Sequence, residues 1–350
     1  MSARRVMIPL MQTDKPSAQR TPFLTAHAFE AVDPELLGMD PATWVPSESV
    51  NFCRAVLGTL ALRPEEVTLV VAGDMVKSVR DRLPEGVDRD AFNDERGAGM
   101  LAGKTMQVGD AVYVLLPYWF FVDSAAALRV LGDEDADDFV AAEETRFRLA
   151  RRTVIHEAQH VVMFQAGEGA IDFSGAARAR RDFVALAHFI VDEYRAELGV
   201  PTEVRETFET EVESTTLPNL QSNLSRIVNE YQLHLDPERL MYSVLPEAQH
   251  AWKALACVAA ARRVAGSTDP LDSDTDGWVL MASTFWDRFE NLLTQVPSAH
   301  TRITQSELKR LAEELADILD DWLRGLGFTW RDIDNGSNAE FRITSWRIVG

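Results

Sequence analysis

Two histidines and a glutamate form the most informative pattern in this sequence. His156, Glu157 and His160 lie within residues 153–162, which read TVIHEAQHVV and contain neither proline nor glycine. The stretch is therefore predicted to be an unbroken helix, and residues four apart on a helix share one face. The two imidazoles can then reach a single zinc ion. Glu157 lies too far round the helix to bind that ion, but its carboxylate can accept a proton from a zinc-bound water that attacks a carbonyl.

The residues around this pattern favour a metal site over a chance match. Val154, Val161 and Val162 are apolar, and Ala158 and Gln159 carry no charge. A helix that buries two histidines and a glutamate needs such neighbours. The alternative is an ordinary amphipathic helix that contains His-Glu-x-x-His by chance, a risk that every short motif carries. With these flanks the pattern resembles that of the zinc metallopeptidases, the zincin superfamily.

A tetrahedral zinc site needs a third protein ligand, and a later predicted helix offers glutamates for it. Residues 161–169 contain no histidine, which excludes the arrangement of the metzincins. Glu193 and Glu197 are four residues apart on an apolar helix face, where a carboxylate needs a partner. This spacing resembles the gluzincins and implies that Glu193 binds the metal while Glu197 orients a ligating imidazole. Asp192 and Glu197 remain alternative ligands, and a solvated helix face is the alternative to both roles.

Tyr231 and His234 are the candidates for a group that stabilises the transition state. Gluzincins usually place a tyrosine or histidine from downstream over the oxyanion, where one donor contributes about 3 kcal/mol. Both residues lie on one predicted helix, and the resemblance implies this catalytic role for them. The alternative is that both lie on an ordinary helix surface.

The order of predicted elements is a small sheet followed by a large helical region, which is an α+β fold class. A β-branched run at residues 67–72 predicts a buried strand. Residues 105–108 and 111–116 predict two strands joined by a Gly-Asp turn, a hairpin. The zincin resemblance implies that an edge strand of this sheet borders the cleft and pairs with the substrate backbone. Helices are predicted at 50–62, 75–83, 136–166, 176–198, 220–235, 247–264, 279–293 and 306–324.

Three regions are expected along the chain. Residues 1–47 form an irregular N-terminal segment, and residues 48–125 a mixed α/β part that holds the cleft-edge strands. Residues 126–350 form a mostly helical part with the zinc helix and the third-ligand helix. The boundary near residue 125 is soft, because both parts are expected to share one core. The family resemblance covers about residues 65 to 200.

The charge and cysteine content narrow the classes of partner and compartment. The formal net charge is −20, and such an acidic surface repels phosphate backbones and anionic lipid, so neither nucleic acid nor a membrane is expected as a partner. The negative charge has two interpretations, solubility alone or, as the more specific alternative, a preference for basic substrates. Cys53 and Cys257 are the only cysteines, too few for a secreted disulfide scaffold. With no signal peptide or membrane span evident, a cytoplasmic location is expected.

The expected function is that of a zinc-dependent hydrolase, a metallopeptidase that cleaves a peptide or protein substrate with Glu157 as general base. The first alternative is a non-catalytic interaction protein with the zincin fold. The second is a di-iron carboxylate oxygenase, because Glu157-Ala-Gln-His160 recurs as Glu247-Ala-Gln-His250 and paired Glu-x-x-His motifs bind di-iron in ferritin-like bundles. Glu193 and Glu143 or Glu144 would complete that set.

Three features weigh against the di-iron alternative. His156 would have no role in it, and the strands before the helix do not belong to a four-helix bundle. Glu247 also follows Pro246, which predicts a helix start there, a poor position for a ligand in the middle of a bundle.

Overall fold

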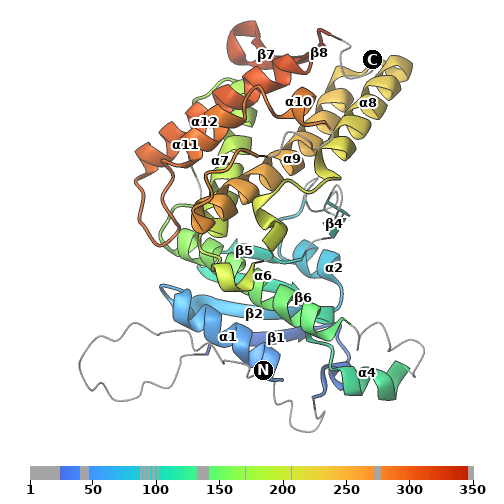
Figure 1. Cartoon of the computed structure of the whole chain (residues 1–350), viewed down its shortest axis with the longest axis vertical. Helices are drawn as coiled ribbons and strands as arrows, with labels where there is room; N and C mark the ends of the chain where they lie inside the picture. Colours follow the sequence, from blue (N-terminus) through green and yellow to red (C-terminus); the bar gives the residue numbers. More distant parts are fainter. Residues whose placement is uncertain are drawn as a thin grey trace.

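The computed structural model mixes helices and strands, so the fold is α+β. It describes residues 24–39, 47–86, 89, 92, 95–96, 99–100, 102–131, 142–169, 171–205, 207–271 and 277–345. A sheet with its covering helices lies at one end of the molecule and a helical half at the other (Figure 1). In the described part of the chain, no helix is long and apolar enough to cross a bilayer.

A four-stranded sheet has the order β1 (Ala26–Glu30), β2 (Val67–Ala72), β6 (Ala111–Pro117) and β5 (Lys104–Val108). The first three strands are parallel, and β5 runs antiparallel to β6. The predicted hairpin is confirmed, and its turn uses Gly109 at φ 62°, a conformation that glycine adopts without steric cost. Among the described strands β5 is an end strand of this sheet, and the outer side of such a strand is where an extended chain can pair.

Strand β1 lies within residues 1–47, the segment predicted to be irregular, so that prediction was wrong for part of the segment. A short 3₁₀ helix, Pro34–Leu37, follows it. The strand AHAFE contains no β-branched residue, and its extended conformation depends on pairing with β2, from Ala26 opposite Thr68 to Glu30 opposite Ala72. Residues 1–23 and 40–46 of the segment lie outside the described residues.

Helices cover both faces of the sheet. Helix α2 (Met75–Arg80) packs on one face, where Val70, Ala72 and Leu115 point. Helices α1 (Glu48–Leu60) and α6 (Glu143–Gln165) pack on the other face. The core on that face includes Val50, Cys53, Leu57, Val67, Leu69, Val71, Val112, Val114, Leu116, Ala150, Val154, Ala158 and Val161. The buried, nearly continuous apolar sequence of β2 is what a central parallel strand needs.

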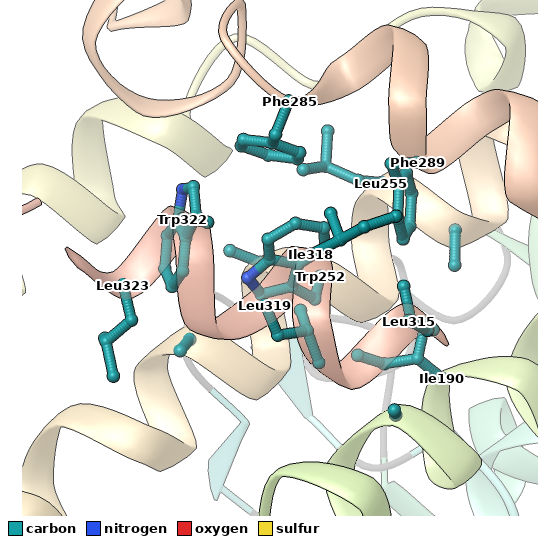
Figure 2. Close-up of a cluster of buried hydrophobic side chains, with 14 of the residues drawn as sticks. Ile190, Trp252, Leu255, Phe285, Phe289, Leu315, Ile318, Leu319, Trp322 and Leu323 are labelled. Atoms are coloured by element: carbon teal, nitrogen blue, oxygen red, sulfur yellow. The ribbon is translucent and has the colours of Figure 1, made fainter. Parts of the chain in front are cut away.

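The helical half has its own core. It is built by α7 (Arg178–Leu198), α8 (Thr216–His234), α9 (Pro237–Ala265), α11 (Trp286–Leu293) and α12 (Gln305–Gly325). Figure 2 shows how aromatic and leucine side chains from α9, α11 and α12 interlock, and the labelled set includes Trp252, Phe285, Phe289, Leu315 and Trp322. The ring centroids of Trp252 and Phe285 are 4.2 Å apart.

Several helix boundaries differ from those predicted. Helix α9 begins ten residues earlier than residue 247 and contains Pro246 in its interior, so the predicted helix start at Glu247 was wrong. The predicted helix 279–293 is divided into α10 (Trp278–Met281) and α11. The predicted helix 136–166 corresponds to α6, and residues 136–141 lie outside the described residues. The helix Ser124–Leu131 (α4) was not predicted.

The last predicted helix is well reproduced. Helix α12 begins after Thr304, whose side chain accepts a hydrogen bond from the Glu307 amide at 3.2 Å and so caps the helix. A hairpin that was not predicted follows it, formed by β7 (Phe328–Ile333) and β8 (Asn338–Ile343). This hairpin packs against α7 and α12 and extends the core of the helical half.

Candidate metal centre

Helix α6 presents two different faces to the two halves of the molecule. Ala150, Val154, Ala158 and Val161 pack on the sheet. At 100° per residue, His156 and His160 then point away from the sheet, toward α7. The local sequence thus fixes the direction of both imidazoles once the apolar face is buried.

The structure brings His156, His160 and Glu193 together at the contact between α6 and α7. Their candidate ligand atoms all lie within 4.8 Å of one another. Nε2 of His156 is 3.4 Å from Oε2 of Glu193, and Nε2 of His160 is 3.7 Å from Oε1. Ligands about 2.0–2.1 Å from a tetrahedral zinc are about 3.3–3.4 Å apart. Two of the three separations are near this value and the donors are of types that bind metal, so the three side chains form a candidate metal site.

Glu197 lies one turn beyond Glu193 and contacts the other side of the His156 ring. Its Oε2 is 2.8 Å from Nδ1 of His156, so Nδ1–H donates to the carboxylate and Nε2 is the ring nitrogen that faces Glu193. Glu197 is 1% exposed, and its Oε1 accepts from Arg152 and Arg205, each at 2.6 Å. The two guanidiniums compensate the buried charge and fix the carboxylate in position.

Glu157 lies beside the three ligands but is not one of them. Thr105 Oγ1, at the edge strand β5, donates a hydrogen bond to Glu157 Oε2 at 2.6 Å. A Cβ atom at Gly103 would lie 2.7 Å from a methyl carbon of Thr153 and 3.0 Å from Glu157 Oε1. The sheet edge therefore approaches the Glu157 carboxylate closely, and a glycine at residue 103 makes this approach possible.

These groups line a cavity of about 1140 Å³. Thr105 and Glu157 contribute to one wall, and His250 and Lys253 of α9 contribute to another. Lys253 Nζ is 2.9 Å from Glu193 Oε2. The cavity thus places a carboxylate that can act as a base and a side-chain ammonium around the same three candidate ligands.

The protonation of the candidate ligands is set by burial and by their carboxylate neighbours. Burial alone would lower the pKa of His156, but the hydrogen bonds and charges of Glu193 and Glu197 raise it to about 9. Burial lowers the pKa of His160 to about 4, against the attraction of Glu193. Burial would raise the pKa of Glu193, but Lys253 and the two histidines hold it well below its usual value. Without metal, His156 is therefore a positively charged imidazolium at neutral pH, and the His160 ring is neutral.

Tyr231 and His234 do not line this cavity. They lie at the end of α8, where their ring centroids are 5.7 Å apart and His234 Nδ1 accepts a hydrogen bond from the Asp236 amide at 2.9 Å. The structure therefore does not bring these two residues to the candidate ligands. Asp192, the rival third ligand, does line the cavity, but it is not in the group of three, and its Oδ2 is 3.6 Å from His188 Nε2.

The second Glu-x-x-His motif does not form a second metal group. Glu247 and His250 line the cavity, but Glu247 Oε2 accepts a hydrogen bond from Asn223 at 2.9 Å. Glu143 and Glu144 are exposed at the start of α6, more than three turns from His156. The described residues contain one group of three potential ligands. The described residues therefore do not show the ligand arrangement that the di-iron alternative needs. The argument that Glu247 begins a helix was itself wrong, since α9 begins at Pro237.

Sequence patterns gave no direct indication of Thr105, Arg152, Arg205 and Lys253, which contact the site from β5, α6, a loop and α9. Gly103 before a predicted edge strand was a usable signal, since it leaves room for another element.

The chain matches no family model, no curated protein and no solved structure. The chemistry of the site is therefore argued from its side chains. They are the imidazoles and carboxylate of the three candidate ligands, the Glu157 carboxylate that accepts a hydrogen bond from Thr105, and the Lys253 ammonium.

Removal of any one of the three candidate ligands should empty the metal site. We expect His160→Ala to abolish stoichiometric zinc and Glu193→Ala to weaken zinc binding by orders of magnitude, because a coordinating atom is lost. The control is Asp192→Asn, which should retain zinc. Metal analysis after dialysis against dilute chelator provides the measurement. Full zinc affinity in Glu193→Ala together with its loss in Asp192→Asn would show that the third ligand was wrongly chosen.

Zinc binding should release a proton from His156. Its pKa of about 9 means that the ring is protonated below that pH, whereas His160, at about 4, is already neutral at pH 6. Since an imidazole must be neutral to bind metal, we expect about one proton per zinc at pH 6. Calorimetry in buffers of different ionisation enthalpy measures this number. A release near zero, or near two, would contradict these protonation states.

Proposed function

We propose that this protein is a zinc-dependent hydrolase that cleaves peptide bonds. The observation that carries the proposal is the arrangement of Glu157, which lies next to the candidate ligands His156, His160 and Glu193 and is held from the other side by Thr105. A structural metal site needs no such carboxylate. A hydrolytic site needs one within reach of the attacking water.

His156, His160 and Glu193 would hold the zinc ion, and a zinc ion held there would supply the Lewis-acid chemistry for polarising a carbonyl and acidifying water. The protein supplies the proton transfer. Glu157 accepts the proton of the attacking water and later returns it to the leaving nitrogen. The Thr105 hydroxyl orients this carboxylate, and Glu197 keeps His156 in the tautomer that binds metal.

The fold around the site supports a gluzincin-like assignment, which is part of the proposal. A helix with His-Glu-x-x-His packs on a small sheet, a glutamate from the next helix completes the ligand group, and an antiparallel edge strand lies beside the glutamate base. Lys104 and Thr105 of β5 line the cavity. An extended peptide that pairs with β5 would therefore pass Glu157 with its main chain in reach.

Replacement of Glu157 by glutamine separates metal binding from catalysis. Glu157→Gln should retain zinc, because Glu157 is not a ligand and the amide is nearly isosteric. Glutamine cannot accept a proton, so turnover should fall by at least about 10²–10⁴-fold. Zinc stoichiometry and cleavage of an unstructured peptide library are compared with wild type. Equal turnover would remove Glu157 from the mechanism, and a zinc-loaded wild type that cleaves nothing would favour the non-catalytic interaction protein.

The Thr105 hydroxyl offers a finer test of how Glu157 is positioned. Thr105→Val keeps the shape of the side chain but removes the donor, and we expect kcat to fall on the order of 10- to 100-fold, the scale of a misplaced catalytic group. Thr105→Ser keeps the donor and should retain most of the activity. Both variants should bind zinc as wild type does. Equal kcat values for the valine and serine variants would show that the hydrogen bond has no role.

A further inference from the structure

Lys253 is a cation that lines the cavity and has no role in the proton transfer by Glu157. It lies on α9, with its Nζ 2.9 Å from Glu193 Oε2. Its side chain is 43% exposed, whereas that of Glu193 is only 8% exposed. The lysine side chain is therefore less covered than the carboxylate that it contacts. It reaches the ligand group and still faces the cavity.

The ammonium group has hydrogen-bonding capacity left over. A protonated lysine carries three N–H donors, and the contact with Glu193 uses one of them. Within the described residues Nζ has no second carboxylate partner, and its other recorded contact is with the Phe189 ring, whose centroid is 5.8 Å away. The other two donors are therefore available to an oxygen atom in the cavity. Because Glu193 is a candidate metal ligand, a carbonyl group that reaches the metal also comes near Lys253.

The other cations that line the cavity in the described residues are placed for different tasks. Arg152 is bound to Glu197 at 2.6 Å and to Glu209 at 2.9 Å. Lys104 begins β5, on the wall that carries Glu157. Tyr231 and His234, the donors that the family resemblance implied, are away from the cavity. Among the described cations that line the cavity, Lys253 of α9 is the one that contacts a candidate metal ligand.

We propose that Lys253 is a catalytic residue that donates a hydrogen bond to the substrate carbonyl oxygen as negative charge develops there. The inference rests on the proposed function and adds the missing oxyanion donor to it. Water adds to the carbonyl carbon, and one of its protons passes to Glu157. The π electron pair moves onto the carbonyl oxygen, beside the ammonium.

The second half of the reaction removes the negative charge from the carbonyl oxygen. The electron pair returns to re-form the carbonyl, the C–N bond breaks, and Glu157 gives its proton to the leaving nitrogen. Lys253 stays protonated throughout. Its attraction for the oxygen is greatest when the charge on that oxygen is greatest, so it stabilises the transition state more than the bound substrate.

The test compares Lys253→Met, which removes the charge, with Lys253→Arg, which keeps it. Lys309→Met, an exposed lysine on α12, is the control. Three quantities are measured for each: zinc stoichiometry, kcat and KM for a peptide that wild type cleaves, and the calorimetric affinity for the phosphinic analogue of trialanine. This analogue is tetrahedral and anionic, so it imitates the charge that Lys253 is proposed to bind.

For Lys253→Met we expect full zinc, a kcat lower by about 10²–10³-fold, as for loss of one oxyanion donor, and a KM within a few-fold of wild type. Affinity for the phosphinic analogue should fall by a similar factor, and Lys253→Arg should restore part of both losses. Unchanged kcat and phosphinate affinity would overturn the proposal. Loss of zinc from Lys253→Met would also overturn it, since Lys253 would then only support Glu193.

The failure of this inference can be told from failure of the proposed function. If zinc-loaded wild type cleaves no peptide, the peptidase proposal fails, and phosphinate affinity alone decides the role of Lys253. Equal affinities of wild type and Lys253→Met would then refute an anion-binding role. If wild type cleaves peptides and Lys253→Met matches it, the hydrolase stands and only the Lys253 assignment is lost.

Discussion

The burial of two carboxylates on one face of α7 is the constraint on which the site depends. Glu193 and Glu197 are 6% and 1% exposed, and an uncompensated charge at such a depth is very costly. Each is therefore matched by partners from other elements. Glu197 is matched by His156, Arg152 and Arg205, and Glu193 by His156 and Lys253.

These partners connect the two halves of the molecule. Arg152 and His156 belong to α6, which packs on the sheet, and Lys253 belongs to α9 in the helical core. The same contacts that compensate charge therefore set the position of α6 against α7 and the separation of the cavity walls. A buried ionic network of this kind is costly to build. The network lies at the contact between the two halves and holds the candidate ligands in place there.

The parts of the site that follow from helix geometry were predictable from sequence. The four-residue spacings of His156 with His160 and of Glu193 with Glu197 place each pair on one face, and the apolar residues between them say which face is buried. The strands were equally clear, at residues 67–72 from a β-branched run and at residues 111–116 from the Gly-Asp turn of the hairpin. These patterns are local and survive any tertiary arrangement.

The rest depended on which elements meet in space. Thr105 and Lys253 reach the site from other elements, 52 positions before Glu157 and 60 after Glu193, and nothing near them in the sequence marks that approach. Tyr231 and His234 had suitable side chains but lie at the far end of α8. The predictions for residues 26–30 and for the helix around Pro246 were wrong for a related reason. Tertiary packing overrides local propensity at both places.

X-ray absorption at the metal edge of the purified protein tests the central claim most directly. The account predicts one zinc per chain, bound by nitrogen and oxygen atoms at about 2.0–2.1 Å with scattering from two imidazole rings and no sulfur neighbour. Two iron atoms per chain with a short metal–metal distance, lost in His250→Ala, would contradict it. So would a protein that binds no metal at all after purification in zinc-containing buffer.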